Sequence, residues 1–349
     1  MSKIVYLLGA GASYGEREKD DKGQEIFGVI KRGVPIVSEF SKAIDQVIID
    51  IRNGNYNNIL PNSNELTDKD RVIKELDWLK ECCENYPTID TYAKMLYVKG
   101  EIGIYNRLKK ALSVFLLLGQ NVNKRDLRYD GFIASLITEN GTLPDINILS
   151  WNYDAQFEFA YSGYENQSNR DMLQIWGKLE ILHKNIPLKT RQLNKFSITK
   201  LNGTAFNFYD DNHKIVDMFF NHQGESLVRL SSILLSNSQN VQVGLSFAWE
   251  KEEKDTSSNK ETFIEQVQKK TFDTEVLVVI GYSFPYVNRE IDRALLGNMF
   301  GLKKIYIQDP NPEEIKESLL ATLYPNKETL YTWVLSKNTR QFIIPNELE

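Results

Sequence analysis

The feature that most constrains this chain is an apolar strand near the N-terminus that ends abruptly in small residues. Residues 4–8, IVYLL, are apolar and rich in strand formers, and Gly9 interrupts them. A run this short, bounded by glycine, predicts a strand buried on both faces, as in a parallel sheet. Residues 9–13, GAGAS, are all small, so the backbone can turn tightly there. We therefore expect an α/β fold organised around this turn.

The same turn predicts an anion site. A ligand can approach a backbone without bulky side chains, and a helix beginning there would direct unpaired N–H groups toward a pyrophosphate. The match to the dinucleotide fingerprint is partial, because Tyr14 stands where a third glycine is usual and residues 16–25 are charged rather than strand-like. This departure counts against an ordinary dehydrogenase. The alternative is that the glycines serve only the close packing of a strand against a helix.

Length and composition exclude several classes of protein. The chain has 349 residues, of which 42% are hydrophobic and 26% charged, as in a globular protein with an ample core. The net charge of −5 gives no electrostatic case for nucleic-acid binding. The two cysteines are adjacent, Cys82 and Cys83, so they form neither a disulfide framework nor a metal module. No signal peptide or membrane-length apolar run is present, so we expect a cytoplasmic protein without a membrane span.

The hydrophobic pattern predicts a single domain over residues 1–349, with a Rossmann-like parallel sheet and helices on both of its faces. Residues 38–140 have helical spacing and form a predicted helical insertion between the first and second strands. Residues 14–33 are predicted as a polar loop that acts as a lid, and the tail 330–349 is expected to pack on the core. Five predicted strands end in polar or glycine-rich turns, at Leu8, Ser150, Leu201, Ile280 and Gln308.

Ligands of open α/β sheets bind beyond the carboxyl ends of the strands, so one pocket can collect all five turns. Asn152 and Asp154 follow the second strand at alternate positions, where both side chains can point the same way and hold a water or an amide group. The alternative is that Asp154 caps a helix and Asn152 makes the turn. Ser283 can donate to a phosphate or a ribose, and Asp309 can accept from ribose hydroxyls or an adenine.

Taken in order, the segments GAGAS, WNYD, KLNG, GYSF and DPNP resemble the SIR2 family, and most closely its bacterial branch of NAD-consuming effectors in antiphage defence. The resemblance covers the sheet elements, whereas residues 38–140 match only in being an insertion. It implies that the GAG turn cradles the NAD pyrophosphate. It places Asn152 and Asp154 where nicotinamide and its ribose bind, and Gly281–Ser283 on the adenosine side.

Two departures from the family pattern matter. Protein-deacylating members carry a zinc module with two CxxC pairs, which this chain lacks, so the NAD-cleaving branch is favoured and no metal is expected. The family strand end KLHG reads KLNG here, so Asn202 stands in place of a catalytic histidine. Asparagine forms hydrogen bonds but cannot take the proton. An inactivating substitution, weak hydrolysis and binding alone all remain open. We expect His183, His213 and His222 to be surface residues rather than replacement bases.

The resemblance therefore implies an NAD+ glycohydrolase that cleaves its substrate to nicotinamide and ADP-ribose and depletes NAD+ in antiphage defence. Because unregulated hydrolysis of NAD+ is toxic, we expect gating by homo-oligomer assembly or by a partner protein. The alternatives are a non-catalytic sensor of NAD or ADP-ribose and, third, an NAD-dependent protein deacylase. The candidate catalytic residues are Asn152, Asp154 and Asn202. The candidate binding residues are Gly9, Ala10, Gly11, Ala12, Ser13, Asn152, Gly203, Thr204, Gly281, Ser283, Phe284 and Asp309.

Overall fold

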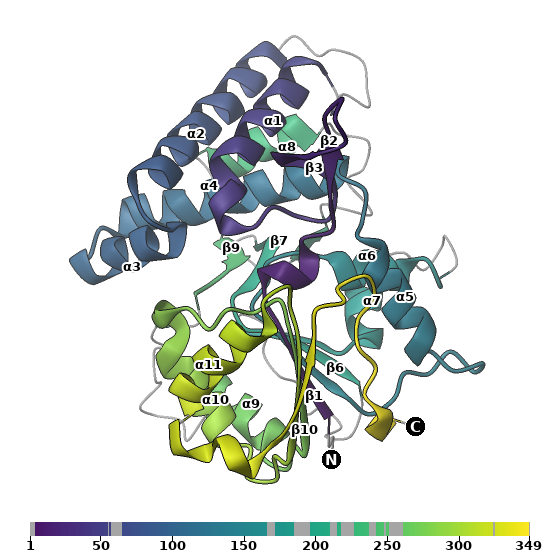
Figure 1. Cartoon of the computed structure of the whole chain (residues 1–349). Helices are drawn as coiled ribbons and strands as arrows, with labels where there is room; N and C mark the ends of the chain where they lie inside the picture. The colour runs from purple at the N-terminus through teal and green to yellow at the C-terminus, as the bar shows by residue number, and fades with distance from the viewer. Residues whose placement is uncertain are drawn as a thin grey trace.

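A seven-stranded sheet forms the centre of the computed structural model (Figure 1). Its strands are β1 (Ile4–Leu8), β4 (Asn147–Ser150), β5 (Ile181–His183), β6 (Ser197–Lys200), β10 (Val276–Ile280), β11 (Lys304–Gln308) and β12 (Thr332–Ser336). They lie in the order β12-β11-β10-β1-β4-β6-β5, and every neighbouring pair is parallel. The predicted Rossmann-like parallel sheet is thus confirmed. The structure describes residues 4–54, 56, 65–165, 172–184, 196–209, 215–217, 227–236, 242–247, 249–250, 261–323 and 325–348.

Helices cover both faces of the sheet, as the sequence predicted, because alternate side chains of each strand point to opposite sides. Val5 and Leu7 of β1 pack in one apolar cluster with α9 (Phe263–Thr271), α10 (Arg289–Gly297) and α11 (Pro312–Leu323). Tyr6 and Leu8 pack on the other face with α5 (Leu127–Leu136), α6 (Gln156–Ser162) and α7 (Met172–Lys178). The central strands are therefore buried on both sides, which explains their unbroken apolar sequence.

A layer of helices stands over the carboxyl edge of the sheet (Figure 1). It contains α1 (Phe40–Arg52), α2 (Glu65–Asn85), α3 (Ile89–Lys99) and α4 (Ile102–Val122), joined by α8 (Leu227–Leu235) from much later in the chain. A small antiparallel sheet of β7 (Gly203–Tyr209), β8 (Ile215–Asp217) and β9 (Gln242–Leu245) packs against α4.

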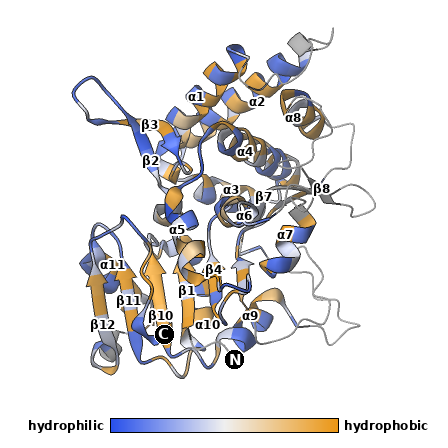
Figure 2. Ribbon diagram, turned by 90° about the vertical axis from the view of Figure 1, so that its right-hand side faces the viewer, coloured by the Kyte–Doolittle hydropathy of each residue, from blue (hydrophilic) through white to orange (hydrophobic). Residues whose placement is uncertain are grey.

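The predicted polar loop over residues 14–33 is wrong, because most of it is an antiparallel hairpin of β2 (Glu16–Lys19) and β3 (Glu25–Arg32) (Figure 2). β2 is charged, and the apolar residues of β3 are interrupted by Gly28 and stay exposed or partly exposed, so the segment lacks the pattern of a buried strand. The fully buried Arg17 holds the hairpin in place by donating to both carboxylate oxygens of Glu39, with 2.8 Å from Nε to Oε1, and to the Val34 carbonyl. A buried charge needs such a partner.

Two strands of the main sheet lie where the sequence predicted none. β5 has only three residues, and β12 is an edge strand whose side chains remain partly exposed, so neither forms a clear apolar run. The tail beyond β12 returns along the sheet, where the Tyr6 hydroxyl donates to the Ile343 carbonyl at 3.0 Å. Short 3-10 helices complete the described chain at Ala10–Ser13, Val37–Glu39, Tyr286–Asn288, Pro325–Leu330 and Asn346–Leu348. None of the described helices has the length and apolarity needed to cross a membrane.

Candidate functional site

The strand order reverses between β1 and β10. From β1 the chain moves to β4 on one side, and from β10 it moves to β11 on the other. In open parallel sheets such a switch point leaves a crevice beyond the carboxyl ends of the two strands, where ligands bind. Both strands end in glycine here, at Gly9 and Gly281. The glycine-rich turn that the sequence singled out therefore lies at the topological switch point.

Gly9, Gly11 and Gly281 pack backbone to backbone, and we call them the glycine junction. The Gly11 N–H donates to the Gly281 carbonyl at 3.0 Å, and the Gly9 N–H donates to the Ile280 carbonyl at 3.1 Å. A Cβ on Gly281 would lie 2.4 Å from the Ala12 nitrogen, and one on Gly9 would lie 2.5 Å from the Gly281 oxygen. The close packing weighed as an alternative is therefore a real requirement at these positions.

The condition for a helix dipole at this turn, an α-helix that begins there, is not met. Gly9 is followed by a single 3-10 turn, Ala10–Ser13, and then by the β2–β3 hairpin, so the segment after Gly9 does not begin an α-helix. The backbone groups are also largely occupied, because Ala12 N–H donates to the Gly9 carbonyl and Gly11 N–H to Gly281. A phosphate at this point would depend on close approach to the junction rather than on a macrodipole.

Two pockets meet at the glycine junction. The first has a volume of about 440 Å³ and contains Asn152 and Asn202, so we call it the amide pocket. The second has a volume of about 630 Å³ and contains Arg128 and Arg340, so we call it the arginine pocket. Gly11 and Gly281 line both. A ligand with two ends can therefore occupy both pockets while its middle crosses the junction.

The amide pocket has walls from both layers of the molecule. Apolar side chains come from the segment after β3 and from the helical layer, including Ile36, Phe40 and Leu116. Polar residues come from the turn after β4, the end of β6 and the turn after β10. The predicted site residues that line this pocket are Ala10, Gly11, Asn152, Asp154, Asn202, Gly281 and Ser283. Residues from distant strand ends are thus brought together as the topology requires.

Asn152 connects the amide pocket to the glycine turn. Its side-chain nitrogen donates to the Gly9 carbonyl at 2.8 Å and to the Ser13 hydroxyl at 3.0 Å. The Ser13 hydroxyl is in turn 2.6 Å from the Tyr129 hydroxyl of α5. The amide nitrogen of Asn152 therefore fixes the turn, and within the described part of the chain no hydrogen bond is made by its Oδ1.

Asp154 has two different carboxylate oxygens. Oδ1 accepts from the Gln156 N–H at 3.1 Å and so stabilises the start of α6, as the helix-capping alternative proposed. Oδ2 is buried and has no hydrogen-bond partner within the described part of the chain. Only 3% of this residue is exposed. A buried carboxylate oxygen without a donor is costly, so this atom is the clearest unmet polar demand in the amide pocket.

Asn202 lies deep in the same pocket and donates from Nδ2 to the Trp151 carbonyl at 3.2 Å and toward the Tyr153 hydroxyl at 3.4 Å. The Tyr153 hydroxyl donates to Oδ1 of Asp90, at the start of α3, at 3.0 Å. Asp90 and Tyr153 also line the amide pocket. Asp90 was not among the predicted site residues. It lies in a helical segment with many charged residues, and no local pattern distinguishes an aspartate that faces a distant sheet from one that faces solvent.

The arginine pocket contains Asp309, one of the predicted binding residues, together with a cation that was not predicted. Arg128 of α5 donates to the Ala12 carbonyl at 3.0 Å and to Asp126 Oδ2 at 2.6 Å. Oδ1 of Asp309 accepts from the Asn311 N–H at 2.9 Å, which closes the turn after β11. The charge of Arg128 is thus neutralised by Asp126, and the hydrogen bond from Arg128 to the Ala12 carbonyl positions the glycine turn.

Several predicted binding residues lie outside both pockets. Gly203 has a φ of +69°, and a Cβ there would lie 2.0 Å from the Gly244 oxygen, so its role is to join β6 to the second sheet. Gly9, Ala12 and Ser13 belong to the turn but line neither pocket, and Thr204 and Phe284 are buried away from both. Ser283, which the resemblance assigns to the adenosine side, lines the amide pocket with Asn152.

The one histidine in the described part of the chain, His183, lines neither pocket. His183 is buried on β5 against Trp176, so its prediction as a surface residue is wrong. His213 and His222 lie outside the described residues. Cys82 and Cys83 are free thiols on α2. Among the residues that the structure describes, no group of three or more histidine, cysteine or acidic side chains could hold a metal ion.

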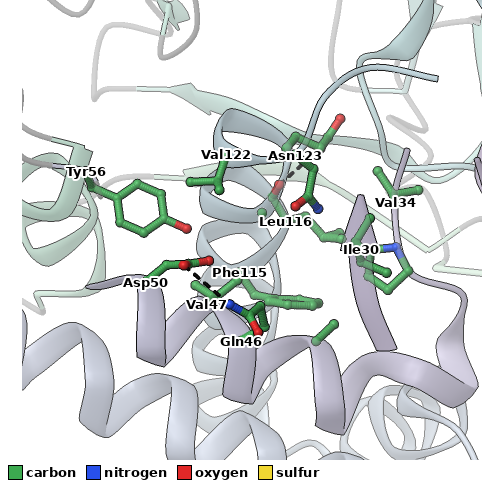
Figure 3. Close-up of a pocket in the computed structure, with 14 residues that line it drawn as sticks. Ile30, Val34, Gln46, Val47, Asp50, Tyr56, Phe115, Leu116, Val122 and Asn123 are labelled. Atoms are coloured by element: carbon green, nitrogen blue, oxygen red, sulfur yellow. Dashed lines mark hydrogen bonds between the residues drawn. The ribbon is translucent and has the colours of Figure 1, made fainter. Parts of the chain in front are cut away.

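A further pocket lies between β3, α1 and α4 and is too small for a cofactor (Figure 3). Its volume of about 20 Å³ has room for roughly one water molecule. Gln46 donates to Asp50 at 3.4 Å within it, and the Tyr56 hydroxyl donates to the Leu118 carbonyl at 3.2 Å. Its polar groups thus pair with one another inside the helical layer.

No family model matches the sequence, and no curated protein matches it. The solved structures that resemble the chain include Sir2 proteins. One is a histidine-to-alanine Sir2 variant with a deacetylated p53 peptide and 3'-O-acetyl ADP ribose, with a TM-score of 0.36 and 11% identity, covering 97% of this chain and 88% of that chain. Another is a histidine-to-asparagine variant of a Sir2 homologue with ADP ribose, with a TM-score of 0.30 and 10% identity, covering 97% and 86%. A third is Sir2Tm bound to a propionylated peptide, with a TM-score of 0.30 and 11% identity, covering 96% and 87%. At TM-scores this low, function is inferred from this chain's own residues.

Proposed function

We propose that this protein binds NAD+ across the glycine junction and hydrolyses the bond between nicotinamide and ribose. The observation that carries the proposal is the pair of pockets, of about 440 and 630 Å³, that meet at Gly11 and Gly281. A dinucleotide has two bulky ends joined by a pyrophosphate, which matches two pockets joined at a turn of small residues. The nicotinamide end occupies the amide pocket and the adenosine end occupies the arginine pocket.

The polar groups of the amide pocket suit the ribose of that ligand. Asp154 Oδ2 is a buried acceptor without a donor, and a ribose hydroxyl supplies one. Asn152 lies beside it with its amide nitrogen committed to Gly9. These two residues therefore hold the sugar adjacent to the junction, so that the reacting C1′ carbon stays inside the pocket.

The reaction is a displacement of nicotinamide by water at C1′. The N-glycosidic bond breaks, its electron pair returns to the pyridine nitrogen, and positive charge passes to the ribose in an oxocarbenium-like transition state. Water then forms the new C1′–O bond and loses a proton. Buried acceptors such as the Asp154 carboxylate stabilise this positive charge. The pocket has apolar walls, so electrostatic interactions inside it are strong. Because free turnover would deplete NAD+, the proposal includes control by self-assembly or by a partner protein, as in antiphage defence.

The test is nicotinamide release from NAD+ by the purified protein, measured by chromatography and with a fluorescent NAD analogue. Asp154→Asn keeps the oxygen that caps α6 and places an NH2 group where the free oxygen points. We expect it to weaken NAD+ binding about 10- to 100-fold, the usual effect of losing one hydrogen bond to a charged group. Asp70→Asn, an exposed aspartate of α2, is the matched control. Unchanged binding by the Asp154 variant contradicts the placement of the ribose.

A sensor that binds NAD+ or ADP-ribose without cleaving it is the second candidate, because Asn202 cannot act as a base. Tight binding with no nicotinamide release, both in the natural chain and in Asn202→His, supports the sensor. Release that appears or rises in Asn202→His supports the enzyme. Release that depends on an added acyl-lysine peptide supports a deacylase instead.

A further inference from the structure

The helical layer places a carboxylate in the wall of the amide pocket. Asp90 lies in the first turn of α3, whose start is capped by Thr88 Oγ1, which accepts from the Thr91 N–H at 3.1 Å. Thr88 and Asp90 both line the amide pocket. The cap fixes the start of the helix, so the position of Asp90 is set by a regular element rather than by a loop.

A directed series of hydrogen bonds ends at Asp90. Asn202 donates toward the Tyr153 hydroxyl at 3.4 Å, and that hydroxyl donates its own proton to Asp90 Oδ1 at 3.0 Å. The Tyr153 proton is thus committed to the carboxylate. The asparagine that stands in place of the family histidine cannot take a proton, but it orients a phenol that holds an acid–base group in the same pocket.

The surroundings of Asp90 favour a carboxyl that can take up a proton. Burial raises the pKa of Asp90, and the hydrogen bond from Tyr153 opposes that rise. The titratable groups that interact with it are the phenols of Tyr153 and Tyr282, and Asp154 lines the same pocket. The pKa of Tyr153 is raised mainly by burial and next by Asp90. Tyr105 and Glu250 raise the pKa of Tyr153 further. Glu250 is itself paired with Lys109, whose Nζ lies 3.1 Å from Glu250 Oε1.

We propose that Asp90 is the general base of the hydrolysis, supplied by the helical segment, and that Tyr153 is its positioning residue. The inference rests on the proposed function. As nicotinamide leaves with the electron pair of the N-glycosidic bond, the water that attacks C1′ transfers a proton to Asp90. The carboxylic acid then releases that proton to solvent, so NAD+ and water give nicotinamide, ADP-ribose and one proton. A positioned general base contributes roughly 10²- to 10⁴-fold in rate.

The experiment measures NAD+ turnover against pH for the natural chain and for Asp90→Asn, with binding measured separately by calorimetry. The variant keeps the size of the side chain and an acceptor for Tyr153. We expect kcat to fall at least about 100-fold, and the rise in rate with pH that reports deprotonation of the base to disappear. NAD+ affinity should stay within about threefold, because a base contributes mainly to the chemical step. Asp70→Asn should leave rate and pH profile unchanged.

Tyr153→Phe separates a base from a merely structural residue. Removing the phenol removes the hydrogen bond that lowers the pKa of Asp90, so the acid limb of the rate profile should move to higher pH. Turnover by Asp90→Asn at the natural rate with the acid limb intact overturns the inference and leaves hydrolysis standing. Binding of NAD+ by the natural chain without turnover also overturns it, in favour of a sensor. Failure to bind NAD+ refutes the proposed function itself, and with it this inference.

Discussion

Lys200 provides the sharpest test of how the site is held together. It is the last residue of β6 and is 1% exposed, and its Nζ donates to the Asp154 carbonyl at 2.6 Å and to Glu158 Oε2 at 3.4 Å. Glu158 is fully buried on α6. Burial raises the pKa of the Glu158 carboxyl, and Lys200 opposes that rise. One ammonium group thus neutralises a buried acid and fixes the backbone of a candidate site residue.

Lys200→Met removes the cation and leaves Glu158 buried without it. Breaking one partner of a buried ion pair costs about 3–5 kcal/mol. With an unfolding entropy of about 2.1 cal/mol/K per residue over 349 residues, this corresponds to a melting temperature lower by about 4–7 °C. The double variant Lys200→Met, Glu158→Leu should recover most of the loss. An apolar replacement of a buried pair is often neutral, and Glu158 Oε1 has no partner to lose within the described residues.

The assay is thermal and urea unfolding of the natural chain, the single variant and the double variant at pH 5 and pH 7.5. In the single variant the folded-state pKa of Glu158 lies above its unfolded value, so stability is present below the unfolded pKa and is lost as pH rises through the folded one. The deficit relative to the natural chain should therefore be smaller at pH 5. A single variant as stable as the natural chain, or a double variant no better than the single one, refutes this account of the pair.

Two further predictions concern the strand β10 side of the site. Gly281 has a φ of +58° and no room for a Cβ, so Gly281→Ala should destabilise the fold by about 2 kcal/mol or more and weaken NAD+ binding, measured by unfolding and calorimetry. Gly103→Ala in α4, where a Cβ meets nothing within 4 Å, should instead stabilise by about 0.5–1 kcal/mol, and equal effects of the two contradict the junction. Burial raises the pKa of Asp292 from 3.8 to about 7, so this group's contribution to stability is lost as pH rises from about 4 to about 7. Asp292→Asn should therefore gain stability relative to the natural chain between pH 5 and pH 8 in unfolding curves, and a constant difference would contradict the shift.

The strand ends of the sheet were predictable because buried parallel strands carry a strong local signal. Residues 4–8 and 276–280 are continuous apolar runs, and each stops at glycine, so the sequence located the turns that meet at the glycine junction. The β2–β3 hairpin carried no such signal, since its one buried charge, Arg17, is satisfied by Glu39 from another element. Its pairing depends on a contact between distant residues and not on a pattern within the strand.

The sequence by itself determined the parallel sheet, its polar strand ends and some of the residues that meet there, because burial on both faces and glycine at a tight turn are local requirements. Only the tertiary structure decided that the site has two pockets and that Asp90 and Tyr153 complete one of them. Asp90 is separated by many residues from each strand end it faces, and its helix reads as an ordinary solvated segment. Its place was fixed by how the helical layer packs over the carboxyl edge of the sheet, which local sequence does not encode.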